Sequence, residues 1–575
     1  MGLFSRTLSI ASRVLLVGAL LLVGPPEAAL AKKPRPGPAP TCSGFTVSPD
    51  RTYRPATSAA LRTTLDCAPL GSTIILGTTA PYVGSFKLSS KSGTGWITVV
   101  SAMAPEVNSA PGLPPAGVRV GPADDAAGAL ARIQAPSGST TPVLSTATGA
   151  HHHRFIGIKF STDHWLDTLV LLGSNSETST SQLPHHLAFD RCFFAGSPTD
   201  GTKHGLMGNA GQGSTFPDDQ ILVENSYFQD FKDHTHDAQA FTAWNGWGPF
   251  LIQNNYLEAS GENVMFGGGD PTITNLIPSS IKVYRNHLYK PLSWVGQGWS
   301  IKNLFELKNA RNVDIAGNVF ENNWIEADQL GWAIVFTPRN QDGRAPWSAV
   351  LNVTFENNLV KNARNGFDLL GTDDIHSSGP LDGVVITNNL LLNLNASIAP
   401  LVAHSAYPEP GQMLYLIHGP RNLTVTYNTS FQSGAITFSN GSATSGFVFS
   451  DNVVRHNQCL GTDNNCGIAG GQISNGQLSS QTAPGNPTLV QYFTQPYTVS
   501  GNTMFDGNTS QDQYPQSNSF PSSVTFVTPD IDPQTGLTSS PDPDYSIVTA
   551  DGTAPGVDWD TLKAAIQGVV QSHSQ

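Results

Sequence analysis

A short module recurs along the chain and constrains its fold more than any other feature of the sequence. Each copy opens with an apolar residue, and its fourth residue is Asn in eight of eleven copies. Successive copies lie 24 to 50 residues apart, which is typical of solenoid coils that carry loop insertions of different lengths. The fourth residues are Ile158, Cys192, Ser226, Asn255, Asn286, Asn318, Asn358, Asn389, Asn428, Asn452 and Asn502.

Alternating apolar residues around each module predict strands joined by short corners. Phe305 and Leu307 are expected to point inward, which leaves Glu306 and Lys308 side by side on the opposite face. Asn tolerates the left-handed conformation that a sharp corner needs. Stacked at one strand spacing, about 4.8 Å, the Asn amides can also hydrogen-bond from coil to coil, so we predict an internal Asn ladder.

The start of the chain predicts a cap for such a solenoid. Residues 57–65 are an amphipathic helix candidate, followed by a tight turn and a strand at 73–76, and this unit would shield the first coil. The cap, the strand–corner–strand coils and the Asn ladder together resemble the pectate-lyase-like superfamily, over about residues 50–560. The resemblance implies an all-β chain folded as a right-handed parallel β-helix. Because the superfamily includes lyases, hydrolases, epimerases and adhesins, it leaves the function open.

The sequence divides into five expected segments. They are a signal peptide at 1–31, a Pro-rich leader at 32–50, the N-terminal cap and first coils at 51–150, the β-helix at 151–505, and an irregular C-terminal tail and cap at 506–575. Within the last segment, a helix at 559–570 is expected to close the C-terminal end.

The N-terminus has the pattern of a secretory signal peptide. Basic Arg6 and Arg13 flank an apolar run at 14–23, and small residues end at Ala31, where we expect cleavage. No later stretch is long and apolar enough to span a membrane. We therefore expect a protein that is secreted or lies on the exterior of the cell envelope.

Five cysteines fit an oxidising compartment. Disulfides are expected between Cys42 and Cys67 and between Cys459 and Cys466, which leaves Cys192 as a buried free thiol.

The formal charge of the chain is −13, from 30 basic and 43 acidic residues. This balance argues against nucleic acid or an anionic membrane as the main partner, because both favour a basic surface. One locally basic cleft would still suffice for an anionic polysaccharide. We therefore expect the partner to be an extracellular acidic polysaccharide. We also expect the protein to be a monomer.

A cleft is expected where one short corner lies between long ones. The corner after Lys308 is minimal, whereas long loops at 267–278 and 338–347 flank it. Cleavage of a uronate by β-elimination needs a cation at the carboxylate, a base for the C5 proton and a donor for the leaving oxygen. Glu306, Lys308 and Arg339 are the catalytic candidates. Lys308 would be the base if Arg339 or Arg344 lowers its pKa and clamps the carboxylate.

This pattern is loosely similar to chondroitinase/alginate-lyase-like β-helix enzymes, in which acidic metal ligands precede a catalytic Lys and an Arg follows one coil later. The resemblance implies a polysaccharide lyase. The rim residues suit a sugar chain, with Trp for stacking and amides or Arg for hydroxyls and carboxylates, although such Trp residues often only cover the core. The substrate-binding candidates are Trp244, Asn245, Trp247, Asn340, Gln341, Arg344 and Trp347.

Two sets of residues are candidate metal ligands. Glu306 and Asp270 could hold Ca²⁺, a hard cation that takes oxygen ligands. His234, His236 and Asp237 could bind a divalent metal or act in acid–base chemistry. A third run, His151–His153, opens a predicted strand and is interpreted as an exposed surface run, with metal binding the less favoured alternative.

Two other functions remain open. The first is a non-catalytic protein of the cell envelope whose loops bind glycans. The second is a glycoside hydrolase using Asp270, Asp373, Asp374 or Glu306, which is less favoured because only Asp373-Asp374 matches the motifs expected of a polygalacturonase-like enzyme.

Overall fold

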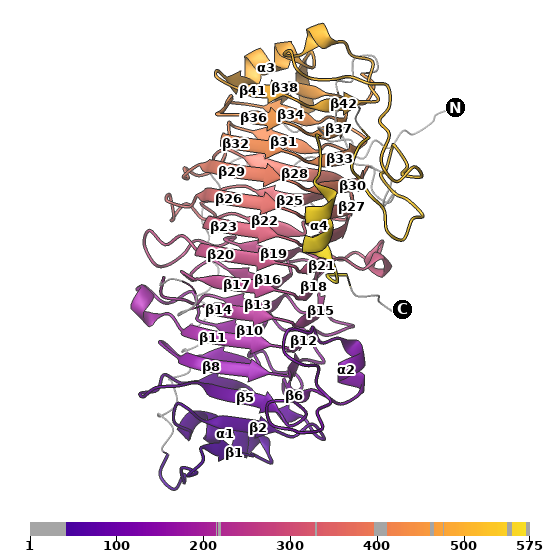
Figure 1. Cartoon of the computed structure of the whole chain (residues 1–575). Coiled ribbons are helices and arrows are strands. Elements are labelled where there is room, and N and C mark those ends of the chain that lie inside the picture. The colour runs from indigo at the N-terminus through magenta and orange to yellow at the C-terminus, as the bar shows by residue number, and fades with distance from the viewer. Residues whose placement is uncertain are drawn as a thin grey trace, which may run out of the picture. The chain divides into compact units, whose positions relative to one another are not determined.

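The structure is a computed structural model that describes residues 42–213, 216, 220–327, 330–395, 411–459, 465–474, 477–548 and 555–570. Its strands form three long sheets in which neighbouring strands come from successive coils and run parallel, except for one antiparallel pair. Figure 1 shows this stack of coils from the N-terminal to the C-terminal end. The predicted all-β fold, a right-handed parallel β-helix, is confirmed.

Sheet A holds 16 strands. They are β1 Thr52–Tyr53, β2 Thr73–Leu76, β5 Ile97–Ser101, β8 His151–Ile156, β11 His185–Asp190, β14 Ile221–Glu224, β17 Phe250–Gln253, β20 Ser279–Tyr284, β23 Ala310–Ala316, β26 Val350–Glu356, β29 Leu381–Thr387, β32 Arg421–Thr426, β35 Thr444–Ser445, β36 Val448–Ser450, β40 Phe493–Thr494 and β41 Thr498–Ser500.

Sheet B follows sheet A in each coil and holds 13 strands. They are β3 Tyr82–Val83, β6 Ala131–Gln134, β9 Ile158–Ser161, β12 Phe193–Ala195, β15 Tyr227–Phe231, β18 Tyr256–Ala259, β21 His287–Tyr289, β24 Val319–Asn323, β27 Leu359–Ala363, β30 Leu390–Leu394, β33 Thr429–Gln432, β37 Val453–Arg455 and β42 Thr503–Phe505.

Sheet C completes the coil and also holds 13 strands, of which the last two pair antiparallel. They are β4 Phe86–Leu88, β7 Leu144–Thr146, β10 Thr168–Leu172, β13 His204–Gly208, β16 Gln239–Ala243, β19 Glu262–Phe266, β22 Phe305–Leu307, β25 Trp332–Phe336, β28 Asn365–Leu370, β31 Leu414–Ile417, β34 Thr437–Asn440, β38 Ile468–Ser474 and β39 Gln477–Thr482.

Few helices accompany the sheets in the described ranges. They are α1 Ser58–Cys67, α2 Pro122–Ala126, α3 Asn486–Tyr492 and α4 Trp559–Ile566, with 3-10 turns η1 Thr180–Gln182, η2 Leu292–Trp294 and η3 Gln511–Gln513.

The inward side chains of all three sheets build one continuous apolar core. Phe305 and Leu307 belong to it, as the alternation of the sequence predicted. Aromatic rings stack from coil to coil within it, and the ring centroids of Phe194 and Phe228 lie 4.1 Å apart. Burial of apolar side chains is the main source of folding stability. In a solenoid each coil contacts only its neighbours, so this burial occurs between successive coils.

The predicted Asn ladder is confirmed at all eight positions, and every one of these side chains is buried. Asn318 shows the pattern: its Oδ1 accepts the backbone N–H of Asn286 at 2.9 Å, and its Nδ2 donates to the carbonyl oxygen of Val283 at 2.8 Å and to Oδ1 of Asn358 at 3.0 Å. Asn518 extends the ladder beyond Asn502. The amides therefore tie each coil to the next at the corners between sheets A and B from Asn255 to Asn518.

One expectation about the ladder was wrong. The left-handed conformation belongs to the residue before the ladder Asn, for example Asn254 at φ 51° and Arg285 at φ 56°, and no ladder Asn has a positive φ. The ladder residues are Asn because their amides both donate and accept inside the core, and not because the corner requires a left-handed Asn.

The N-terminal helix caps the stack as predicted. Thr57 begins α1 by accepting the N–H of Ala60, and Leu61 and Leu65 pack one turn apart into the core. The predicted disulfide between Cys42 and Cys67 is present and ties the end of this helix to the segment before it.

The C-terminal end is closed differently from the prediction. The helix α3 covers the last coils, because Leu489 and Tyr492 belong to the core. The helix α4, which was expected to close this end, packs instead on the outer face of sheet B through Trp559 and Leu562 (Figure 1). Arg285 donates to carbonyl oxygens after this helix, so the tail runs back along the coils.

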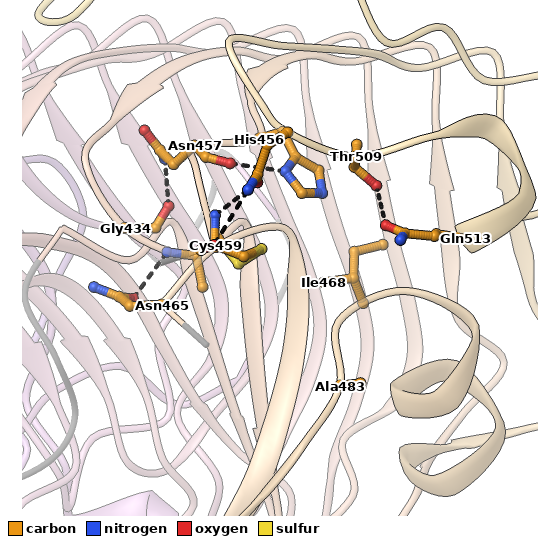
Figure 2. Close-up of a disulfide and its surroundings, with 12 residues drawn as sticks. Gly434, His456, Asn457, Cys459, Asn465, Ile468, Ala483, Thr509 and Gln513 are labelled. Carbon is orange, nitrogen blue, oxygen red and sulfur yellow. Dashed lines mark hydrogen bonds between the residues drawn. A yellow bond between two sulfur atoms is a disulfide. The ribbon is translucent and has the colours of Figure 1, made fainter. Parts of the chain in front are cut away.

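The remaining cysteines behave as expected. Cys459 and Cys466 form a disulfide beside His456 and Asn457 (Figure 2). Cys192 is a free, buried thiol whose pKa burial raises.

The predicted signal peptide and most of the leader lie outside the described residues, which begin at Cys42. Within the described ranges, no helix has the length and apolar character needed to cross a membrane.

Replacement of a ladder amide tests its contribution to stability. Asn318→Ala leaves the buried N–H of Asn286 and the carbonyl of Val283 without their partners, so we expect the free energy of unfolding to fall by about 3 kcal/mol, measured by denaturant titration. Asn352→Gly is the matched control, because Asn352 is exposed, has φ 54°, and is followed by Gly383 at the equivalent position of the next coil. Equal losses for the two variants would contradict the role given to the ladder.

Candidate functional site

A hollow of about 380 Å³ opens on the outer face of sheet C, and it is called the sheet C hollow below. Residues from the strands β13, β16 and β19 form its floor, and loops form its rim. The lining residues are Lys203, His204, Thr235, His236, Asp237, Gln239, Trp244, Met265, Gly268, Lys308 and Gln341.

The register of sheet C explains why these residues meet. His204 pairs with Gln239, and Gln239 pairs with Glu262 on the next strand. Met265 pairs with Glu306 one coil further. Because every second residue of a strand faces outward, residues that are 20 to 40 positions apart in sequence form columns on one face.

Lys308 lies at this floor as predicted, but its charge differs from the expectation. Its Nζ lies 3.4 Å from Oε1 of Glu306, whose side chain is only 3% exposed. Burial lowers the pKa of Lys308, but Glu306 and Glu262 outweigh that effect and raise it above its ordinary value. Lys308 is therefore an ammonium ion, and the proposal that it acts as a base with a lowered pKa was wrong.

Arg339 lies one coil beyond Lys308, as the sequence suggested. Its backbone N–H donates to the carbonyl oxygen of Lys308 at 2.9 Å. Its guanidinium, however, pairs with Asp373 at 2.9 Å and also with Asp374. Arg344 is 71% exposed and pairs with Asp342 at 2.5 Å. Neither guanidinium is thus arranged to lower the pKa of Lys308 or to clamp a carboxylate beside it.

Sequence reasoning missed several residues of the hollow, among them Lys203 and His204, and His204 is the one with acid–base chemistry. Its Nδ1 lies 3.2 Å from Oγ1 of Thr168, which donates to the Asp167 carboxylate at 3.0 Å. This chain of hydrogen bonds assigns the imidazole proton to Nδ1, so Nε2 carries the lone pair. Burial lowers the pKa of His204, so the ring is neutral at neutral pH.

The signal for His204 was present in the repeat. The strand His204–Gly208 lies one coil before the strand Gln239–Ala243. Recognising it as the preceding copy of that strand would have placed His204 in the same column as Gln239 and Glu262.

Two further acids are buried on sheet C. Glu262 is fully buried and accepts a hydrogen bond from Gln239 at 2.5 Å, and burial, reinforced by Glu306, raises its pKa. Asp368 lies two strands from Glu306 along the same column, and burial raises its pKa to about 7.

The expected rim contacts are only partly present. Trp244 and Gln341 line the sheet C hollow. Asn245 is fully buried and donates to the carbonyl of Glu177 at 3.1 Å, and Asn340 is buried and accepts the N–H of Ala345. These two Asn residues order loops and do not face the hollow.

Trp247 and Trp347 also support loops. Trp247 packs against the apolar cluster of Leu183, Ile273 and Leu276, and Trp347 donates its Nε1–H to the carbonyl of Leu276 at 3.0 Å. These two Trp residues therefore support loops and cover apolar side chains, which was the alternative to sugar stacking.

The proposed ligand set His234, His236 and Asp237 does not converge. His234 stacks on Trp299 with ring centroids 3.8 Å apart, and Nδ1 of His236 lies 3.1 Å from Asp233. Asp237 pairs with Lys302 at 2.9 Å.

The pair proposed for Ca²⁺ does not fit that ion either. Oδ2 of Asp270 accepts the backbone N–H groups of Asp342 and Arg344, at 3.0 and 2.9 Å, and so holds the loop 338–347. Glu306 is occupied by Lys308 and by Asn303, which donates at 2.8 Å. Over the described ranges, neither proposed ligand set forms a group of three converging ligand atoms.

Neither a protein-family model nor a curated protein sequence matches this chain. Three solved structures illustrate what it is similar to. The catalytic unit of a GH87 α-1,3-glucanase from Streptomyces thermodiastaticus is 12% identical over 80% of this chain and 68% of that chain, with a TM-score of 0.46. An alginate lyase from Paenibacillus sp. is 13% identical over 82% and 97%, with a TM-score of 0.24. The surface adhesin PfbA of Streptococcus pneumoniae is 12% identical over 86% and 95%, with a TM-score of 0.37. The fold assignment rests on the three parallel sheets and not on these likenesses.

The raised pKa of Asp368 gives a pH-dependent prediction. Because the folded pKa lies above that of the unfolded chain, the stability linked to this group is present at low pH and is lost as pH rises through about 7. Asp368→Asn mimics the protonated acid. We expect it to match the wild type at pH 4 and to be more stable at pH 8, by a few kcal/mol at most. An equal difference in unfolding free energy at both pH values would contradict this account.

Proposed function

We propose that this chain is a secreted, carbohydrate-active β-helix protein of the pectate-lyase-like superfamily that cleaves uronate-containing polysaccharide by β-elimination in the sheet C hollow. The observation that carries the proposal is the presence of a neutral imidazole, His204, and the ammonium group of Lys308 in one hollow, which Lys203 also lines. An acidic protein that presents cations at a cleft suits an anionic polymer.

The chemistry assigns a role to each of these groups. The ammonium of Lys308 neutralises the uronate carboxylate and stabilises the charge that develops when the C5 proton is removed. Nε2 of His204 takes that proton, with Thr168 and Asp167 holding the tautomer through Nδ1. The C4–O bond then breaks, a C4=C5 double bond forms, and the leaving oxygen takes a proton from solvent.

The sugar chain is proposed to contact the walls of the hollow. The indole of Trp244 offers a face for a pyranose ring, and the amide of Gln341 offers hydrogen bonds to hydroxyl groups. No step of this mechanism uses Ca²⁺, because Glu306 and Asp270 already bind protein groups.

Hydrolysis is less well supported by the geometry. A glycoside hydrolase of the usual kind needs two carboxyl groups that flank the bond. Among the described residues, Asp237 is the one carboxylate that lines the hollow, while Glu262 and Glu306 are buried. Asp373 and Asp374 are paired with Arg339. A glycan-binding protein without chemistry is the remaining alternative, and the assay below distinguishes it.

Incubation with alginate, pectate and glycosaminoglycans tests the proposal. A lyase produces the absorbance of an unsaturated uronide, a hydrolase raises reducing ends without it, and a binder does neither. We expect His204→Asn and Lys308→Ala each to lower kcat/KM at least 100-fold, because each removes a group acting in the transition state. Lys361→Ala is the matched control, since Lys361 lies on sheet B and pairs with Glu321. Unchanged turnover in His204→Asn would exclude this residue as the base.

The pH profile gives an independent test. His204 must be neutral and Lys308 charged, so activity is expected to rise through a pKa below the ordinary value for His, about 6.5, and to remain high beyond pH 9. An acid limb centred above pH 7 would contradict the assignment of His204, and a fall in activity between pH 7 and 9 would contradict that of Lys308.

A further inference from the structure

Four histidines lie together on sheet A, apart from the sheet C hollow. His151 and His152 begin the strand β8, and His185 and His186 begin the strand β11 of the next coil. The parallel register pairs His185 with His151, so the four imidazoles form two adjacent rows. All four residues are half-buried. The interpretation of His151–His153 as an exposed run was therefore wrong, and His153 itself is completely buried.

Ring nitrogens of three residues in this four-histidine cluster converge, and the fourth residue, His151, lies beside His152. Nδ1 of His151 lies 2.8 Å from Nδ1 of His152, and Nδ1 of His185 lies 2.6 Å from Nδ1 of His186. Ligand atoms of His152, His185 and His186 all lie within 4.8 Å of one another. With metal–nitrogen bonds of 2.0–2.1 Å, neighbouring ligands in a tetrahedral zinc site are about 3.3 Å apart. The two short pairs, at 2.8 and 2.6 Å, must open slightly, and the ligand atoms that lie up to 4.8 Å apart must move closer together around the ion.

The backbone position of two of these histidines recurs in other coils with different residues. His152 and His186 have φ values of 57° and 52°, and the register places Asn312 and Asn352 at the equivalent position, with φ values of 55° and 54°. In other coils, therefore, Asn adopts this left-handed backbone conformation. The backbone alone does not explain why two consecutive coils carry imidazoles here, which points to the chemistry of the rings.

An aromatic side chain packs against the rings. Trp96 forms one wall, with its ring centroid 5.2 Å from that of His152, and the guanidinium of Arg154 lies over the same indole, 4.9 Å from the ring centroid. Neutral imidazoles are the form that binds metals.

We propose that the four-histidine cluster binds one divalent transition-metal ion of the class that prefers imidazole, such as Zn²⁺. In each pair, the proton of the donating Nδ1 shifts to Nε2 of the same ring, so both rings remain neutral and offer an Nδ1 lone pair. The ion then links the strand β8 to the strand β11 and stabilises the N-terminal coils. This site is independent of the proposed enzymatic function, because it lies on a different sheet and uses different residues.

Zinc titration of the untagged full chain at pH 7.5 tests the proposal. We expect calorimetry to show saturable binding of one Zn²⁺ per chain and a higher melting temperature with Zn²⁺ than with a chelator. The double variant His152→Asn/His186→Asn keeps residues that adopt positive φ but removes two ligands, so its affinity should fall at least 100-fold. His418→Asn is the matched control, because His418 also has a positive φ, 53°, but lies on a distant coil.

The outcomes separate clearly. Binding that is lost in the double variant and kept in His418→Asn supports the site, as does loss of binding at pH 5, where imidazoles are protonated. Absence of saturable binding by the wild type, or equal affinity in the double variant, overturns it. If the double variant does not fold, electron paramagnetic resonance of the wild type with one equivalent of Cu²⁺ decides: coupling to several imidazole nitrogens supports the site, and its absence overturns it.

Discussion

The hydrogen bonds between stacked Asn amides set the register on which the rest of the molecule depends. In each coil from Asn255 to Asn502 the ladder amide accepts the N–H of the preceding coil and donates to the next, as Asn318 does between Asn286 and Asn358. A slip of one residue would leave these buried groups unpaired and turn every apolar side chain outward. The parallel register also forms the columns on the outer faces. One of these columns brings His204 beside Gln239 and Glu262, in coils where Ser226 takes the place of the ladder amide and donates from its N–H to Asn255.

The sequence was sufficient for the architecture because the architecture repeats. The ladder, the inward orientation of Phe305 and Leu307, the capping helix and both disulfides all follow from local patterns that occur several times or have a fixed spacing. The sequence-based prediction put the C-terminal helix at the end of the stack, which was wrong. The amphipathic pattern of α4 would suit any apolar surface, and only tertiary packing selects the outer face of sheet B.

The electrostatics of the site could not be predicted in the same way. The pKa of Lys308 depends on Glu262, 46 positions earlier in the sequence, and the guanidinium of Arg339 is neutralised by Asp373 and Asp374 of the following coil. Such pairs depend on side-chain directions and loop paths. The four histidines of sheet A illustrate the same limit: one run was visible in the sequence, but its convergence with the second arises only from stacking.

A crystal structure of the protein with a uronate oligosaccharide would test the central claim most directly. The account predicts a sugar ring in the sheet C hollow, with its carboxylate within 4 Å of Nζ of Lys308 and its C5 within reach of Nε2 of His204. An oligosaccharide bound on another face, or bound in the hollow with C5 turned away from His204, would contradict it.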